Sequence, residues 1–596
     1  MFLKSVPGLQ KFLLWKTKHL SQQQFILILS AIIGFAAGLG AVLIKNLTHF
    51  IQNLLEGNFI ANYHHAFYFI FPIIGLALTV FIIKKILRKP VGHGIPSTLY
   101  AISKRKGLMR SFQMYGSILT APLTVGFGGS VGLEGPTVAT GASLGSNISR
   151  LFRMNQSART LLVGCAAAGA MSSIFKAPIA AIIFAIEVFS LDLTLVSMLP
   201  LLTASVSAIL TSYFFFGSDT ILPFELHDNF HISEVPFYMI LGCICALGSM
   251  YFTIIYFRIH SLFGKIENKF TRLLLAGTGL GIIIYFIPPL YGEGYGVINN
   301  LLAENYIEAL GTNFLNDFLD NIWVVILLLA GLVIFKIFAT SLTFAAGGVG
   351  GIFAPVLFMG SALGHCFALV VNHLGIVDKP ISTSSFTMVG MAGLMAGVLH
   401  APLTAIFLIA ELTGGYELFV PLMITALISY MITNTVQPHS VYTMELAQRG
   451  ELLTHDKDQT VLTLLDINQI IERDFVPLNV TMTLGDVIHE GVIKSPRNIF
   501  PVLDQEENFM GIILLDDIRP IMFKQHLYDE ITVNDIMQRA PDTIDLQNDS
   551  MKTIMKKFQN SAAWNLPVVK EDKYVGFISK SKMLTAYRQK LIEVTV

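Results

Sequence analysis

The chain has 596 residues, of which 53% are hydrophobic and only 13% are charged, and its mean hydropathy is +0.63. These values exclude an ordinary soluble protein of this size and indicate a membrane protein. The net charge at pH 7 is zero, so charge gives no reason to expect nucleic acid as a partner.

The N-terminal segment, residues 1–20, is basic and partly amphipathic, without the small-residue cleavage site of a signal peptide. It is predicted to lie along the cytoplasmic side of the lipid bilayer. Residues 21–446 are predicted to form the transmembrane domain. Apolar runs that could cross a bilayer recur there, including Phe25–Ile44, Phe67–Ile86, Ile240–Tyr256, Leu273–Leu290, Trp323–Ile337 and Leu418–Ile432. Glycines and prolines interrupt several runs, which predicts that some helices end within the membrane.

Two clusters of basic residues indicate the orientation of the chain. Cytoplasmic loops carry an excess of lysine and arginine, so both clusters are predicted to lie on the cytoplasmic side. The clusters are Lys84, Lys85, Arg88 and Lys89, followed by Lys104, Arg105, Lys106 and Arg110. The stretch "VGHGIPST" between them is therefore expected near the cytoplasm. We expect the protein in the cell membrane, with its N-terminus and C-terminal tail inside.

The membrane part of the sequence repeats itself. "GAMSSIFKAPIAAIIFAIE", from Gly169, aligns without a gap on "GLMAGVLHAPLTAIFLIAE", from Gly393. "GGSVGLEGPTVATGASLG", from Gly128, aligns on "GGVGGIFAPVLFMGSALG", from Gly347, at nearly the same offset. These two pairs indicate an internal duplication. Duplicated transport folds usually form their substrate site where the halves meet, from interrupted helices.

Three segments combine glycines with a proline ahead of helix-forming residues. They are "GHGIPST" with Pro96, "GLEGPTV" with Pro136 and "GIFAPVL" with Pro355. Each is predicted to be a loop that enters a helix N-terminus, because glycine allows irregular backbone and proline suits the first turn. Such an end attracts an anion without a buried cationic side chain. The alternative is that these small residues and prolines serve only helix packing and kinks.

These segments, together with Tyr442 in "SVYTMELAQRG", resemble the four anion-pathway signatures of the CLC family of chloride channels and chloride/proton antiporters. The resemblance covers about residues 20 to 450. It implies an all-α polytopic domain of two inverted repeats with re-entrant helices. It also implies a homodimer with a separate pore in each subunit, no enzyme activity, and chloride or another small anion as the substrate.

The resemblance assigns roles by position. It makes Glu134 the gate, a carboxylate that competes with the anion and moves aside when it binds a proton; the alternative is a cap on the helix that starts at Pro136. Outside this pattern, Tyr442 would be interpreted as an interfacial aromatic residue. The residues implied in anion binding are His93, Gly94, Ile95, Gly135, Ile352, Phe353, Ala354 and Tyr442.

The sequence departs from the family pattern at His93, where serine is usual. An imidazole N–H can also donate to an anion, so chloride, fluoride, nitrate and bicarbonate all remain candidate substrates. The alternative is a histidine turned away from the pore and bonded to a backbone carbonyl. A smaller departure is Leu133, where many members have an arginine that would make the outer mouth more positive.

A second departure concerns proton transfer. Many antiporters of the family have an internal proton-accepting glutamate where this chain has Val188, which cannot carry a proton. Channel members lack it too, so the sequence favours passive or weakly proton-coupled anion conduction gated by Glu134. The alternative is a proton-coupled anion antiporter. The neighbouring Glu187 and its repeat partner Glu411 are predicted to cap or tie helices.

The tail resembles a tandem pair of α+β cystathionine-β-synthase (CBS) domains. After a linker, residues 447–473, the repeats are predicted at residues 474–530 and 531–596. "NIFPVLDQEENFMGIILLDDI" and "WNLPVVKEDKYVGFISKSKM" share a plan of strand, turn, strand and helix start. Because CBS pairs often bind adenosine nucleotides, the resemblance singles out Asp517 in the first repeat and Ser579 in the second. The alternative is a dimerising and gate-coupling module without a ligand.

Other classes of protein fit the sequence poorly. It has no HExxH, no P-loop Lys-Ser/Thr and no CxxC, and its intramembrane carboxylates are too few for a cation pathway. The four cysteines lie in apolar segments without metal-ligand or disulfide spacing. We therefore expect no metal site, no required cofactor and no enzyme activity.

Overall fold

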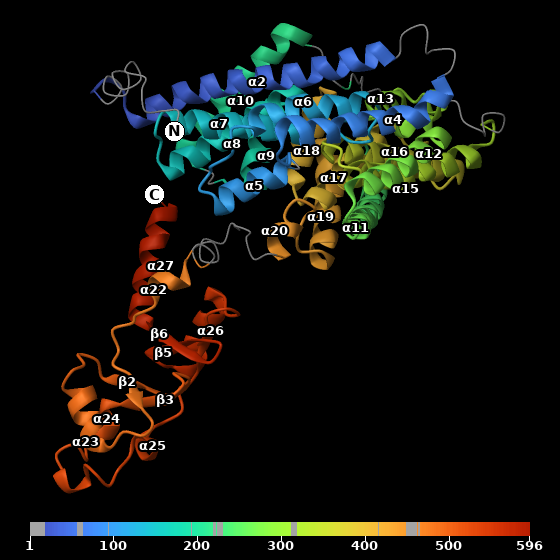
Figure 1. Ribbon diagram of the computed structural model, residues 1–596. Helices are drawn as coiled ribbons and strands as arrows, with labels where there is room; N and C mark the ends of the chain where they lie inside the picture. The colour runs from blue at the N-terminus through green and yellow to red at the C-terminus, as the bar shows by residue number, and fades with distance from the viewer. Residues whose placement is uncertain are drawn as a thin grey trace. The chain divides into compact units, whose positions relative to one another are not determined.

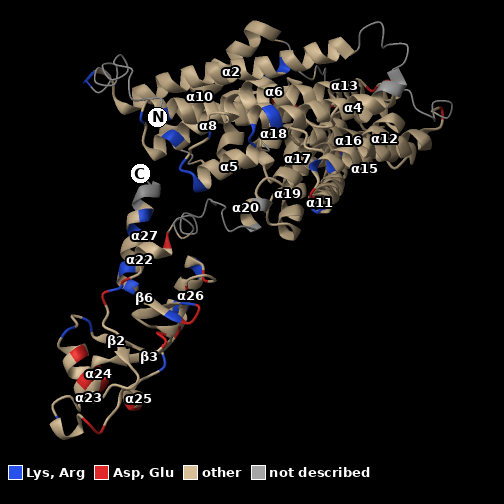
Figure 2. Cartoon of the chain, viewed as in Figure 1, with Lys and Arg blue, Asp and Glu red and all other residues tan. Residues whose placement is uncertain are grey.

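The structure, a computed structural model, describes residues 18–55, 64–92, 94–191, 194–218, 222, 230–311, 319–414, 416–448, 462 and 465–595. The chain divides into two compact units, Met1–Leu452 and Leu453–Val596. Charged side chains are sparse in the first unit and frequent in the second (Figure 2). Residues 1–17 of the predicted interfacial segment and most of the predicted linker lie outside the described residues.

The first unit is a bundle of α-helices (Figure 1). Within the described residues, nine helical segments are long and apolar enough to cross a membrane. The helices in chain order are α2 (Gln22–Leu55), α4 (His64–Phe81), α5 (Ile95–Lys104), α6 (Gln113–Gly126), α7 (Glu134–Leu151), α8 (Gln156–Phe175), α9 (Pro178–Phe189), α10 (Leu195–Phe216), α11 (Val235–Gly264), α12 (Lys269–Phe286), α13 (Tyr295–Leu302), α14 (Tyr306–Leu310), α15 (Ile322–Ala345), α16 (Phe353–His373), α17 (Thr383–Leu399), α18 (Pro402–Thr413), α19 (Phe419–Val436) and α20 (Met444–Gln448).

The predicted apolar runs fall on these helices, with two differences: Phe67–Ile86 continues past α4 into a π-helical segment, η1 (Ile82–Leu87), and the run that starts at Leu273 passes the end of α12. The run was expected to continue to Leu290, but α12 ends at Phe286 and a short 3₁₀ turn, η3 (Pro288–Leu290), follows. Two consecutive prolines, at positions 288 and 289, cannot supply the N–H groups that a continuing α-helix needs. The chain therefore turns here, and the residues after η3 reach the functional site.

The two sequence repeats have the same backbone conformation. Helices α7, α8 and α9 of the first half correspond to α16, α17 and α18 of the second. A left-handed backbone is uncommon outside glycine, so its recurrence at matching positions is a specific sign of a shared fold. The matching pairs are Gly128 with Gly347 (φ 91° and 97°), Lys176 with His400 (55° and 54°) and Ser190 with Gly414 (54° and 75°).

A carboxylate at the end of α9 caps the start of α18. Glu187 accepts hydrogen bonds from the backbone N–H groups of Leu403 (3.2 Å) and Thr404 (2.8 Å), and from the Thr404 hydroxyl (2.6 Å). The first N–H groups of any helix lack partners within the helix, and the helix dipole favours a negative charge beside them. Glu187 therefore satisfies donors that would otherwise be unpaired in an apolar environment.

The repeat-related contact is made in the opposite direction. Glu411, at the end of α18, accepts hydrogen bonds from the backbone N–H groups of Ile179 (3.1 Å) and Ala180 (2.8 Å) at the start of α9. Each helix thus supplies a carboxylate to the N-terminus of the other, which requires α9 and α18 to run antiparallel. The capping role predicted for Glu187 and Glu411 is confirmed, and the reciprocity shows that the two halves are inverted repeats.

The second unit contains two similar α+β repeats. Each has three strands, of which the first two are parallel and the last two antiparallel. The strands are β1 (Leu478–Asn479), β2 (Ile499–Leu503) and β3 (Phe509–Leu514), then β4 (Ile544–Asp545), β5 (Asn565–Lys570) and β6 (Lys573–Ser579). Helices α24 (Leu515–Ile518) and α27 (Lys580–Thr595) follow β3 and β6 directly. This order confirms the predicted plan of strand, turn, strand and helix start.

We expect Glu187→Ala to lower the melting temperature of the protein in detergent. The substitution removes three hydrogen bonds to a charged acceptor at the start of α18, and it should cost about 1–3 kcal/mol of unfolding free energy. Glu411→Ala should act in the same direction. Glu308→Ala, on an exposed part of α14, is the matched control. Equal melting temperatures for Glu187→Ala and Glu308→Ala would contradict the capping role.

Candidate functional site

The two glycine-rich loops that precede α7 and α16 pair directly with each other. The Gly132 N–H donates to the Gly351 carbonyl at 2.9 Å, and the Gly351 N–H donates to the Gly132 carbonyl at 2.7 Å. These two glycines are at equivalent positions of the repeats. A Cβ atom on Gly351 would lie 2.7 Å from the backbone nitrogen of Gly135, so the approach depends on glycine. The bridge therefore holds the first turns of α7 and α16 side by side.

The start of α5 joins this pair. Helix α5 begins at Ile95 with Pro96 in its first turn, and Gly94 before it has a φ of 67°. A Cβ atom on Gly94 would lie 2.5 Å from the carbonyl oxygen of Gly135 in the first turn of α7. Three helix N-termini thus meet at one place, and each brings first-turn N–H groups and a partial positive charge.

A cavity of about 30 Å³, called the small cavity below, lies at this meeting point. Its volume is comparable to the space that one water molecule occupies in the liquid. It is lined by Ile95, Pro96, Gly135, Tyr256, Phe344, Gly350, Gly351, Ile352, Val441 and Tyr442. Four of the residues predicted to bind the anion are therefore together: Ile95, Gly135, Ile352 and Tyr442.

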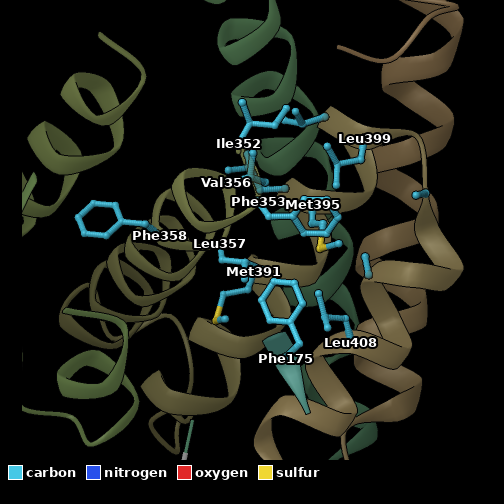
Figure 3. Close-up of a cluster of buried hydrophobic side chains, with 14 of the residues drawn as sticks. Phe175, Ile352, Phe353, Val356, Leu357, Phe358, Met391, Met395, Leu399 and Leu408 are labelled. Atoms are coloured by element: carbon cyan, nitrogen blue, oxygen red, sulfur yellow. The ribbon is translucent and has the colours of Figure 1, made fainter. Parts of the chain in front are cut away.

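The other predicted residues are placed differently. Gly94, Phe353 and Ala354 do not line the small cavity: Gly94 and Phe353 are next to the lining residues Ile95 and Ile352, and Ala354 is one position further along α16. The Phe353 side chain packs among apolar residues (Figure 3), with ring centroids 5.9 Å from Phe175 and 5.6 Å from Phe184. This packing anchors the first turn of α16. His93 lies outside the described residues.

Tyr442 brings a hydroxyl group to the small cavity. The side chain is only 5% exposed, and its ring stacks on Phe353 with a centroid distance of 6.3 Å. Its hydroxyl is buried and has no hydrogen-bond partner in the described part of the chain. An unsatisfied buried polar group costs about 1–3 kcal/mol, and an anion in the cavity would accept its hydrogen bond. Together with helix N-termini, this donor set fits a small anion.

Glu134 is the first residue of α7 and is only 1% exposed. Its Oε1 accepts a hydrogen bond from the Tyr295 hydroxyl at 3.0 Å, while Oε2 has no partner among the described residues. Oε2 lies against the paired loops, 3.1 Å from where a Cβ on Gly351 would be. The next residue, Gly135, lines the small cavity. The carboxylate is therefore placed at the edge of the small cavity and not in it.

Two larger cavities lie beside the small one. The mixed-charge cavity, of about 610 Å³, is lined by Glu134 and by further ionisable side chains that include Lys45, His49, Lys176 and Glu293. The basic cavity, of about 240 Å³, is lined by residues that include Lys84, His260, Lys269 and Arg272. Phe344 lines both the basic cavity and the small cavity. The mixed-charge cavity, the small cavity and the basic cavity therefore follow one another, with Glu134 between the first two.

Three residues of the site were missed in the sequence. Tyr295 holds Glu134, and Glu293 accepts a hydrogen bond from the Leu133 N–H at 3.1 Å. Lys336 in α15 is fully buried and donates to the Gly292 carbonyl at 3.1 Å. A signal was present for two of them, because "YGEGYG" places a carboxylate between glycines as "GLEG" does. A lysine within the apolar α15 was a second signal.

Val188 was predicted, from the family resemblance, to stand where many antiporters have a proton-accepting glutamate. Val188 is buried in α9, with 9% of its surface exposed. The adjacent Glu187 is engaged by three hydrogen bonds at the start of α18. Val188 has no group that binds a proton, and the Glu187 carboxylate is occupied by its role as a helix cap.

In the second unit, the two residues singled out for nucleotide binding are each held by a neighbour. Asp517 accepts hydrogen bonds from the Leu514 N–H (3.2 Å) and the Gln538 side-chain amide (3.0 Å). The Ser579 hydroxyl donates to Glu472 at 2.5 Å. Gln538 and Glu472 occupy corresponding places, since each pairs with the third strand of its sheet. Asp517 and Ser579 themselves are at different positions of the repeats, because Asp517 is six residues after Gly511 and Ser579 is three residues after Gly576.

The pKa of Asp474, near Glu472, is lowered by the guanidinium of Arg497, which bonds both carboxylates. A lowered carboxyl pKa means that this contact adds stability above the unfolded-state pKa. That contribution is lost as the pH falls through the lower, folded-state value. At neutral pH the link is therefore fully formed, and it helps to hold the Glu472 segment on β6.

The inverted repeats, with a cavity at their junction, define the first unit as a polytopic membrane transport protein. Residues 75–434 match the family described as voltage gated chloride channel, and residues 533–589 match the CBS domain. The first match covers more than half of the chain. The protein therefore belongs to the voltage gated chloride channel, or CLC, family, whose members transport anions and are not enzymes, and it carries a C-terminal CBS region.

Individual relatives agree with this assignment. The chain is 27% identical over 436 residues to the H(+)/Cl(−) exchange transporter ClcA of Vibrio cholerae serotype O1 (strain M66-2), covering 71% of this chain and 89% of ClcA. A slow cyanobacterial Cl−/H+ antiporter has the same fold, with a TM-score of 0.61, 22% identity and coverage of 72% and 98%. A eukaryotic CLC transporter aligns over 94% of this chain and 97% of its own, with a TM-score of 0.57 and 17% identity.

We expect Tyr442→Phe to weaken chloride binding to the purified protein. The substitution removes one hydroxyl donor from the small cavity, so the dissociation constant should rise about 2- to 12-fold, equivalent to about 0.5–1.5 kcal/mol. Isothermal titration calorimetry measures this change. Tyr285→Phe, at the exposed end of α12, is the matched control and should bind chloride like the wild type. An unchanged constant for Tyr442→Phe would remove the hydroxyl from the anion site.

Proposed function

We propose that this protein is a proton-coupled antiporter that exchanges chloride or a similar monovalent anion for protons. The observation that carries the proposal is the place of Glu134, a protonatable side chain at the edge of the small cavity, with one carboxylate oxygen unpaired among the described residues. The relationship to ClcA, which is named an exchange transporter, also favours exchange over the passive conduction suggested by Val188.

The proposed coupling follows from competition for the same partial charges. An anion in the small cavity is stabilised by helix N-termini and by the Tyr442 hydroxyl. The ionised Glu134 is attracted to the same electropositive helix ends, so carboxylate and anion exclude each other. Once protonated, the side chain no longer competes, and the anion can pass. Each anion passage is thereby linked to a protonation state of Glu134.

We propose that the basic cavity faces the cytoplasm and the mixed-charge cavity faces outward. The support is the positive-inside bias, because Lys84 belongs to a predicted cytoplasmic cluster and lines the basic cavity. Lysine and arginine side chains there raise the local anion concentration without contacting the ion in the small cavity. The missing carboxylate at Val188 means that protons from the cytoplasm reach Glu134 by a route other than that position.

Passive conduction is the second candidate function. Val188 favours it, because the side chain cannot carry a proton between the cytoplasm and Glu134. A channel would move anions down their gradient and leave the proton gradient untouched. The two candidates therefore differ in one measurable quantity, the number of protons moved for each anion.

We also propose that the protein is a homodimer with one pathway in each subunit. Ile179 on α9 and Leu403 on α18 are repeat-related, apolar and 44% and 52% exposed. A surface with its own approximate two-fold symmetry suits an isologous contact with a second copy. Light scattering in detergent should give twice the chain mass of 65.6 kDa, and a protein mass of one chain would exclude the dimer.

For the CBS pair, adenosine nucleotide binding stays a prediction. The CBS match at residues 533–589 supports the kind of domain. Because Asp517 and Ser579 already have partners, a nucleotide that used them would have to replace the hydrogen bonds to Gln538 and Glu472. Nucleotide binding would thereby free the segments that these two side chains hold.

Purified protein in lipid vesicles tests the proposed function. With an imposed chloride gradient, we expect protons to move against their own gradient, recorded together with chloride flux. Glu134→Gln mimics the protonated side chain, so it should abolish proton movement and flatten the pH dependence while chloride still moves. Glu308→Gln, on exposed α14, should behave like the wild type. Chloride flux without proton movement in the wild type would favour the channel instead.

A further inference from the structure

A second carboxylate is attached to the segment that carries Glu134. Glu293 Oε1 accepts a hydrogen bond from the backbone N–H of Leu133, the residue before Glu134, at 3.1 Å. Two residues after Glu293, the Tyr295 hydroxyl donates to Glu134 Oε1 at 3.0 Å. The two hydrogen bonds run between the same two segments. They place both carboxylates at the wall of one volume, the mixed-charge cavity.

The loop that carries Glu293 is held in place by α15 and α16. Lys336 donates to the carbonyl of Gly292 at 3.1 Å, and its ammonium lies 4.5 Å from the ring centroid of Phe358. Gly294 has a φ of 89°, and a Cβ atom there would lie 2.5 Å from the Phe358 ring. Only glycine fits this turn. Glu293 is therefore a fixed part of the cavity wall.

The charges around Glu293 come from three helices, α2, α7 and α15. Glu134 on α7 interacts with it electrostatically as a like charge, and Lys45 and Lys336 as opposite charges. Among the described residues, the other ionisable and polar side chains that face the mixed-charge cavity or border it are Lys45, His49 and Gln52 from α2, Lys176 after α8, Glu134 from α7, Tyr291, Tyr295 from α13 and Lys336 from α15. The lysines make one ionised carboxylate favourable, while two in one cavity repel each other.

The two carboxylates also differ in access. Glu134 is 1% exposed, whereas Glu293 is partly exposed to the mixed-charge cavity. A proton that arrives in that cavity therefore meets Glu293 first. The two carboxylates repel each other when both are ionised. Binding one proton to either carboxylate relieves this repulsion, so the pair favours the state with a single proton.

We propose that Glu293 is an outer proton-relay residue that passes protons between the mixed-charge cavity and Glu134. This inference rests on the proposed antiport function. In the inward direction, the Glu293 carboxylate takes a proton from a hydronium ion that enters the cavity, which leaves water; it then gives the proton to the Glu134 carboxylate and returns to its ionised form. The anion pathway needs no such step, since the anion binds in the small cavity. Glu293 therefore affects the number of protons moved for each anion and not the binding of the anion.

Glu293→Gln tests the relay in vesicles that report proton and chloride flux together. Glutamine keeps an oxygen that can accept from the Leu133 N–H, so the hydrogen bond at the start of α7 is retained, while the site can no longer carry a proton. We expect the ratio of proton to chloride flux to fall by about tenfold or more, as for loss of a positioned proton-transfer group. The activation of flux on acidification should also move to lower pH, because a neighbouring negative charge is lost.

Glu293→Asp and Glu308→Gln complete the test. Aspartate can carry a proton, so Glu293→Asp should recover part of the flux ratio, and Glu308→Gln should match the wild type. An unchanged ratio in Glu293→Gln overturns the relay. Equal losses of proton and chloride flux in Glu293→Gln, restored together in Glu293→Asp, also overturn it, because a structural role predicts that pattern. Absence of proton flux in the wild type would instead remove the antiport function itself.

Discussion

The pairing of two glycine-rich loops determines the rest of the membrane unit. Gly132 and Gly351 exchange two backbone hydrogen bonds, and this contact requires that neither residue has a side chain. Once the loops are paired, α7 and α16 must begin beside each other, and α5 reaches them because Gly94 also lacks a Cβ atom. Helix ends that would repel one another electrostatically are thus held together by packing elsewhere. Their combined field is what an anion experiences.

The arrangement of the cavities separates partial charges from full charges. Backbone partial charges surround the small cavity, so an anion bound there would not be held by a cationic side chain in a low dielectric. Full charges line the larger cavities on either side, where water screens them. Glu134 lies at the boundary between the two environments. Because Glu134 is buried, its ionised form is sensitive to any other charge at that boundary, and the proposed coupling of anion and proton rests on this sensitivity.

The sequence predicted features that depend on local signals. Glycines next to a proline predict a helix start, and Pro96, Pro136 and Pro355 identified three such starts. The internal sequence repeat predicted the two halves. Contacts between distant segments left no such signal. Tyr295 reaches Glu134 across 161 positions of the sequence. The Phe353 ring points away from the small cavity because it packs on Phe175 and Phe184, which only the folded chain brings close to it.

The reciprocal caps of α9 and α18 have a consequence for the origin of the fold. Each half provides the carboxylate that the other half needs, and neither can satisfy its own helix start. A protein with a single copy of the repeat would meet the same need only by associating with another copy in the opposite orientation. Such an ancestor would have inserted into the membrane in both topologies, and gene fusion would later have fixed one of each.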